Sequence, residues 1–149
     1  MVKFAAFNAA ANCLAAIGSD GRIWLVDLLQ PHESVVSQLP GSQGVAVSSD
    51  CSRIAAAADR TVAVWSAAGD PLIRLEASDP VVALAFSPNR HQLAVASGSN
   101  LQAWFLERQD LIRSACGQVP ITQLLKDRWT VYSREPYRDT CGEALRAAH

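Results

Sequence analysis

Few residues in this 149-residue chain are of a type that could do acid–base or metal chemistry. The three histidines are His32 and His91, in predicted turns, and His149, the last residue. A histidine base works beside a nucleophile, and a third group orients it. None of the three stands in such a pattern, and a G-x-S-x-G segment is absent from the sequence. We therefore predict no catalytic residue, no metal site and no cofactor.

The four cysteines give no metal-ligand spacing either. Cys13, Cys51, Cys116 and Cys141 contain no C-x-x-C pair and no zinc pattern. Their spacing favours a reduced, intracellular setting, so we expect a cytoplasmic protein. Cys116 and Cys141 bracket the C-terminal tail and could lie close together, as packed thiols in preference to a disulfide.

Charge and hydropathy exclude some classes of binding partner. Thirteen basic and fourteen acidic residues, interspersed, give a net charge of −1. A nucleic-acid or anionic-membrane binder needs a basic surface, so neither partner is expected. No apolar run has the length of a membrane span. The first 16 residues loosely resemble a signal peptide, but Asn8 and Asn12 interrupt them, and we expect no leader.

The strongest signal in the sequence is a repeat with a period near 40 residues. The segment 81–106 matches residues 39 places earlier, and again 39 or 40 places before those. The matching positions are Phe86, Val47 and Phe7; Leu93, Ile54 and Leu14; Trp104, Trp65 and Val26; and Ser87 with Ser48. Such a period is typical of a stacked or radial repeat architecture.

Each copy of the repeat contains short apolar segments separated by turn residues. In the first copy these predict strands at 2–7, 13–17, 22–28 and 34–39, and Asp20-Gly21 predicts a hairpin turn. In the second copy the expected strands are 44–48, 53–58, 61–66 and 71–76. Segments such as IAAAA are apolar at every position, which indicates sheets covered on both faces. We expect an all-β partial propeller of about three four-stranded blades, at 1–42, 43–80 and 81–109.

Two segments resemble the blade of a WD-repeat propeller. They are F-S-P-N-R-x-x-L-A-x-A-S-G-S at 86–99 and G-S-D-G-x-I-x-L-V-D-L at 18–28. The resemblance gives structural roles to Asp20 in a hairpin turn and to Asp27, Trp65 and Trp104 at the Trp-Asp dipeptide. Asp59, in a turn of the second copy, is a further structural residue. Only Asp27 keeps the aspartate of that dipeptide. The family's Gly-His is replaced by Gly41-Ser42 and Ser78-Asp79, so its buried hydrogen-bond set cannot form in full.

The tail, 110–149, changes character. In 110–118 the apolar residues follow helical spacing, with Asp110 as a candidate N-cap, whereas the repeat register would place a fourth strand there. We favour the helix. A second short helix is expected at 123–133, before Pro136. We predict that Trp129, Tyr132 and Tyr137 dock the tail on the propeller, with contact to a partner as the alternative.

The tail also resembles the segment after the last blade in bacterial signalling NTPases of the STAND class. The matching residues are Ala115, Cys116, Leu124, Trp129, Tyr132, Glu135, Pro136, Tyr137, Arg138, Thr140 and Cys141. In that family the propeller is the sensor, and a separate module hydrolyses nucleotide. This chain has no G-x-x-x-x-G-K-[ST] segment and so no phosphate-binding loop.

These observations predict a non-catalytic protein–protein interaction or scaffold module, as the sensor or C-terminal part of a STAND-type signalling WD-repeat protein. Rim loops containing Arg60, Asp79 and Arg90 are the general place for partner contact. The alternatives are a propeller-based hydrolase, for which the inner strands contain no converging His, Asp or Glu, and a structural remnant. Since closed propellers need four to eight blades, three arrangements stay open: part of a longer propeller, a ring of several copies, or an arc covered by another protein.

Overall fold

The chain folds as a β-rich unit followed by a second unit in which the described residues form one helix. The structure, a computed structural model, describes residues 1–8, 10–29, 32–89, 92–118, 129, 131 and 141. It divides the chain into two compact units, Met1–Leu106 and Glu107–His149, and each is described by itself. All the described strands lie in the first unit.

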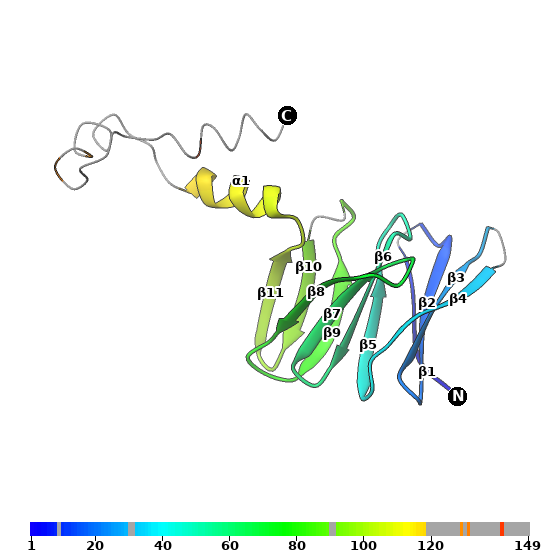
Figure 1. The fold of residues 1–149 in the computed structure, drawn as a ribbon. Helices are drawn as coiled ribbons and strands as arrows, with labels where there is room; N and C mark the ends of the chain where they lie inside the picture. Colours follow the sequence, from blue (N-terminus) through cyan, green and yellow to red (C-terminus); the bar gives the residue numbers. More distant parts are fainter. Residues whose placement is uncertain are drawn as a thin grey trace. The chain divides into compact units, whose positions relative to one another are not determined.

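The first unit consists of three antiparallel sheets that stand side by side, hereafter blades 1 to 3 (Figure 1). Blade 1 contains β1 (Val2–Phe7), β2 (Cys13–Gly18), β3 (Arg22–Asp27) and β4 (His32–Gln38). Blade 2 contains β5 (Ser42–Val47), β6 (Arg53–Ala58), β7 (Thr61–Ser66) and β8 (Pro71–Glu76). Blade 3 contains β9 (Val81–Phe86), β10 (Gln92–Ser97) and β11 (Asn100–Phe105).

Each blade is a meander in which neighbouring strands in the sequence pair with one another. The first strands of the blades, β1, β5 and β9, lie next to one another, with β5 between the other two. This is the arrangement of strands around a propeller axis, and it confirms the predicted partial β-propeller.

Apolar side chains of adjacent blades form the core between the sheets. One cluster joins blades 1 and 2 and includes Ile17, Ile23, Ile54 and Trp65. A second cluster joins blades 2 and 3 and includes Val62, Val64, Leu93 and Val95. Blade 2 is therefore covered on both faces, which is why its strands are apolar at nearly every position.

The turns between strands use residues that tolerate a positive φ. Gly21 closes the β2–β3 turn with a φ of 79°. A Cβ atom at Gly21 would lie 2.7 Å from the carbonyl oxygen of Leu39, so glycine is required there for space as well as for conformation. In the equivalent turn of blade 2, Asp59 takes this role with a φ of 52°.

Blades 1 and 2 have the predicted four strands, whereas the described residues of blade 3 supply three. Where a fourth strand was the alternative, the chain forms helix α1 (Arg108–Gln118), so the prediction of a helix is confirmed. The prediction that Asp110 is the N-cap of this helix was wrong. The amide of Leu111 already donates to the carbonyl of Glu107 (3.1 Å), which places Asp110 inside the first turn. A carboxylate there still interacts favourably with the helix dipole.

The predicted second helix, at 123–133, lies outside the described residues apart from single positions. In the described part of the chain, no helix is both long enough and apolar enough to cross a membrane.

Candidate interaction surface

One rim of the first unit is formed by the turns that follow the second strand of each blade and by the loops that enter the next blade. We call it the charged rim and define it by Asp20, Arg22, Asp59, Arg60 and Asp79. Asp20 and Arg22 form an ion pair at 3.3 Å, with side chains 50% and 59% exposed. Asp59 and Arg60 are also exposed. The rim thus presents both signs of charge to solvent.

Backbone hydrogen bonds fix the charged rim between blades 2 and 3. The amide of Val81 donates to the carbonyl of Asp59 (2.7 Å), and the amide of Ala77 donates to the carbonyl of Arg60 (2.8 Å). Arg60 Nε also donates to the carbonyl of Ala77 (3.3 Å). The turn of blade 2 and the loop into blade 3 are therefore held together, and the two rim residues predicted here, Arg60 and Asp79, lie on the same rim.

The same rim continues at both sides of that junction. In blade 1, Gln38 Nε2 donates to the carbonyl of Asp20 (2.9 Å), which ties β4 to the β2–β3 turn. At blade 3, a Cβ atom on Gly98 would lie 3.0 Å from the Cβ of Asp79. Because Gly98 lacks that atom, the β10–β11 turn packs directly against Asp79.

The opposite rim differs in composition and in hydrogen bonding. We call it the polar rim; it consists of the turns after the first strand of each blade, at 8–12, 48–52 and 87–89. At each turn a side-chain oxygen accepts from the amide five residues later: Asn8 from Cys13 (3.1 Å), Ser48 from Arg53 (3.0 Å) and Ser87 from Gln92 (3.1 Å). Its polar groups are therefore used within the fold. Arg90, the third rim residue predicted, lies outside the described residues.

The predicted structural residues of the blades fall in two environments. Trp65 is 8% exposed in the cluster between blades 1 and 2, and Trp104 packs partly buried against the cluster between blades 2 and 3. Trp104 Nε1 donates to Gln102 Oε1 (3.1 Å). Asp27, at the end of β3, accepts from the amide of Leu29 (2.8 Å) and so shapes the loop toward β4.

The cysteines differ from the expectation of free thiols. Cys13 and Cys51 form a disulfide, and Cys116 and Cys141 form another, so no free cysteine remains. Cys13 and Cys51 are separated by 38 residues, about one repeat, which places them opposite each other across the interface of blades 1 and 2. Since disulfides persist in oxidising compartments, they weigh against the cytoplasmic location expected from the sequence.

Of the predicted tail residues, the structure describes Trp129, which is 39% exposed, and the two cysteines of the second disulfide. Tyr132 and Tyr137 lie outside the described residues, and the docking role of the three aromatic residues stays a prediction. Among the described residues, no group of three or more His, Cys, Asp or Glu side chains could hold a metal ion.

Sequence reasoning missed the side-chain hydrogen bonds in the turns of the polar rim and the disulfide between Cys13 and Cys51. Both had a signal in the repeat. Ser87 matches Ser48 at 39 places, and the two cysteines are 38 residues apart, close to one period. The hydrogen bond that the amide five residues later donates to each serine oxygen depends on the geometry of the turn, which the sequence does not show.

The comparisons with known proteins agree with this architecture. Residues 29–66 and 69–104 match the family model described as WD domain, G-beta repeat. Each matched segment begins around the last strand of one blade and ends near the third strand of the next, so a sequence repeat spans two blades. No curated protein sequence matches the chain.

Solved structures resemble the fold at low sequence identity. The β-propeller domain of Myceliophteria thermophila Cps50 (Swd1) is 19% identical with a TM-score of 0.52, over 70% of this chain and 38% of that one. Kuenenia stuttgartiensis hydrazine synthase is 13% identical with a TM-score of 0.56, over 66% of this chain and 31% of that one. The chain thus spans about a third of the length of either structure. It contains WD40 repeats, folded as three blades of a β-propeller.

Proposed function

We propose that this chain is a non-catalytic protein–protein interaction module that binds its partner with the charged rim. The WD40 repeats support this class of function, because proteins with such propellers are generally interaction scaffolds. The observation that carries the choice of surface is the contrast between the two rims. Side chains of the polar rim are bonded within and between its turns, and the exposed charge among its described residues is that of Asp50, whereas the charged rim exposes both signs of charge, at Asp20, Arg22, Asp59 and Arg60.

A rim of this kind suits a protein segment that contains both acidic and basic residues. Exposed charges steer association and select a partner more than they add affinity. Arg60 is well placed for this role, because its Nε bond to the carbonyl of Ala77 fixes the side chain at the rim before binding. A guanidinium held in this way loses less side-chain entropy on binding a carboxylate.

A narrower proposal places the module in a STAND-type signalling protein, as its sensor part. It is supported by the tail motif that contains Ala115, Cys116, Trp129 and Cys141, which are described, together with residues outside the described set. In the structure Cys116 and Cys141, which bracket the motif, are joined. On this proposal, nucleotide hydrolysis belongs to a different module, since this chain has no phosphate-binding loop.

The test is affinity capture from the host with three baits, compared by quantitative mass spectrometry. The baits are the wild-type chain, the charged-rim variant Arg60→Glu/Asp59→Lys, and the polar-rim variant Ser49→Lys/Asn89→Lys. A partner bound through the charged rim is captured by the wild type and the polar-rim variant and is lost from the charged-rim variant. The proposal is wrong if all captured proteins are equally retained by the charged-rim variant, or if only the polar-rim variant loses them.

A further inference from the structure

Two sheet faces of the first unit lack a neighbouring blade. In each blade, we call the face toward the preceding blade its leading face and the face toward the following blade its trailing face. The trailing face of blade 1 packs on the leading face of blade 2, and the trailing face of blade 2 packs on the leading face of blade 3. The leading face of blade 1 and the trailing face of blade 3 are left open in the described unit.

The leading face of blade 1 is large and apolar. Cys13, Ala15 and Ile17 of β2 are buried against blade 2, so Leu14 and Ala16 between them point the other way. Residues directly opposite in an antiparallel pair share a face. The register therefore extends this face to Phe7 and Val26 beside Leu14, and to Ala5, Trp24 and Val35 beside Ala16. Phe7 is 65% exposed and Val35 is 59% exposed.

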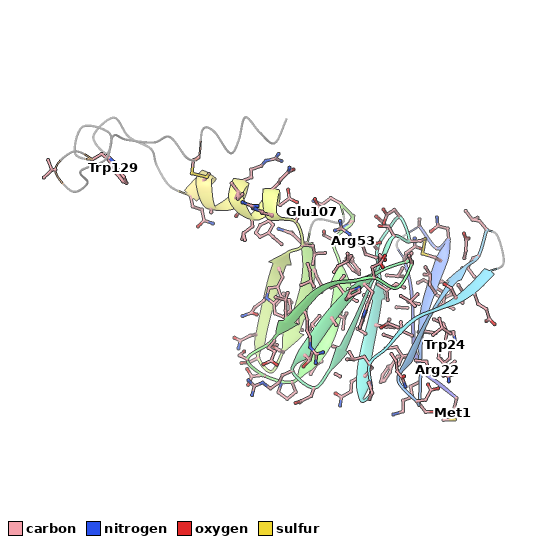
Figure 2. The ribbon with its side chains drawn as sticks, viewed as in Figure 1. Met1, Arg22, Trp24, Arg53, Glu107 and Trp129 are labelled. Atoms are coloured by element: carbon pink, nitrogen blue, oxygen red, sulfur yellow. A yellow bond between two sulfur atoms is a disulfide. The ribbon has the colours of Figure 1, made fainter. Side chains whose placement is uncertain are left out.

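Trp24 is the largest side chain on this face (Figure 2). Gly18 lets its ring lie close to β2, since a Cβ atom there would be 2.6 Å from Trp24 Cη2. The charged residues that the register places on the face, Arg22 and Glu33, stand at the ends of its rows. The middle of the face is apolar.

The trailing face of blade 3 is built of small side chains. Leu93 and Val95 of β10 are buried against blade 2, so Ala94 and Ala96 point outward. Strand register completes two rows across the sheet, Ala85–Ala94–Ala103 and Ala83–Ala96–Leu101. Leu101 is 77% exposed, so nothing in the described chain covers this face at that point.

The two open faces are the two halves of an interface that the chain already makes internally. Between blades 2 and 3, the small trailing residues Ala55, Ala57, Val62 and Val64 pack against the large leading residues Phe86, Leu93 and Trp104. The residues equivalent to the first set, 39 positions later in blade 3, are Ala94, Ala96, Leu101 and Ala103. The residues equivalent to the second set, two periods earlier in blade 1, are Phe7, Leu14 and Val26. Each open face is therefore the repeat equivalent of a face that is buried elsewhere in the molecule.

We propose that a second copy of this chain covers both faces. The trailing face of blade 3 in each copy packs on the leading face of blade 1 in the other, so that two copies close a ring of six blades. Six lies within the range of known propellers, and the reciprocal contact gives the pair twofold symmetry. A second copy is the occupant because it presents both complementary faces at once and continues the two internal interfaces. Arg22 of the charged rim lies at the margin of this contact, whereas Asp59 and Arg60 belong to the middle blade, so the proposal does not depend on which partner the rim binds.

The experiment is light scattering of the purified full chain at about 100 µM, with circular dichroism on each sample to check folding. The wild type is expected at twice the monomer mass of 16.0 kDa. Two leading-face variants, Trp24→Glu and Phe7→Glu, and the trailing-face variant Leu101→Arg are each expected to be monomeric. Leu72→Glu is the matched control, because Leu72 is 48% exposed on β8, in the middle blade, and should leave the dimer intact.

A mixture of two variants distinguishes this head-to-tail contact from other modes of dimerisation. A 1:1 mixture of Phe7→Glu and Leu101→Arg retains one intact trailing face and one intact leading face, and is expected to recover a dimer that neither variant forms alone. A folded wild-type monomer, a dimer that survives Leu101→Arg, or a mixture that stays monomeric would each overturn the proposal.

Discussion

Asn8 Nδ2 donates a hydrogen bond of 2.9 Å to the carbonyl oxygen of Ser49, and this bond joins the first turn of blade 1 to that of blade 2. Ser49 Oγ in turn donates to the carbonyl of Pro88 (2.9 Å), which joins blade 2 to blade 3. Hydrogen bonds thus run along the polar rim from blade to blade, beside the apolar clusters that fill the space between the sheets.

The position of Asn8 leads to the first prediction. Its side chain is 5% exposed, and its oxygen also accepts from the amides of Asn12 and Cys13. Asn8→Ala removes all these bonds and leaves buried groups without a partner, so we expect a loss of about 2–3 kcal/mol in the free energy of unfolding. Ser49→Ala, which removes one exposed hydrogen bond, should cost about 0.5 kcal/mol. Urea unfolding followed by tryptophan fluorescence gives both values; equal losses would contradict the role of Asn8.

The two predicted blade tryptophans should differ in their contribution to stability. Trp65 is 8% exposed between two blades, so Trp65→Ala is expected to cost about 3–5 kcal/mol through lost packing and the cavity left behind. Trp104 is only partly buried, and Trp104→Ala should cost roughly half as much. Chemical unfolding followed by circular dichroism measures both. A larger loss for Trp104 would mean that blade 3 is covered more fully than the structure shows.

The disulfide between Cys13 and Cys51 crosslinks blades 1 and 2 and should stabilise the first unit. Its removal in Cys13→Ala/Cys51→Ala is expected to cost roughly 2–4 kcal/mol, because the unfolded chain regains the freedom of a closed loop. Removal of the second disulfide, in Cys116→Ala/Cys141→Ala, is the control and should leave melting of the β-rich unit unchanged, since those residues lie in a separate unit. The measurement is thermal unfolding followed by circular dichroism in the β region, after thiol titration of the unreduced protein. Free thiols in that titration would contradict the crosslink.

Two glycines with nearly the same backbone conformation should respond differently to alanine. Gly21 and Gly41 have φ values of 79° and 77°. A Cβ atom at Gly21 meets the backbone of Leu39 and Pro40 within 3 Å, whereas at Gly41 nothing lies within 4 Å. Gly41→Ala should therefore cost only the left-handed conformation, about 1–2 kcal/mol, and Gly21→Ala at least twice that. Comparable urea midpoints for the two variants would show that the backbone around Gly21 can move aside.

The repeat made most of the fold predictable from the sequence. Equivalent apolar positions such as Ile54 and Leu93 recur at 39 residues because each blade must bury the same two faces, and the strands follow from that spacing. The start of helix α1 was not predictable to the residue, because Glu107 and Asp110 are both suitable near a helix N-terminus.

The candidate surface was less accessible to sequence reasoning. Arg60 and Asp79 lie 19 positions apart, and only the built strands show that the Arg60 turn and the loop into blade 3 share a rim. The prediction of free cysteines failed for a different reason. Their composition indicates a redox compartment only statistically, whereas the contact between Cys13 and Cys51 depends on which face of one blade meets the turn of the next.

The central claim, that the charged rim contacts a protein partner, is tested most directly by site-specific photo-crosslinking in the host. A photoreactive amino acid is placed at Asp59 on the charged rim and, in a matched chain, at Asp50 on the polar rim. Our account predicts that the probe at position 59 gives a discrete crosslinked product containing a second protein, and that the probe at position 50 gives none. Crosslinks from position 50 alone, or none from position 59 in a folded chain, would contradict the claim.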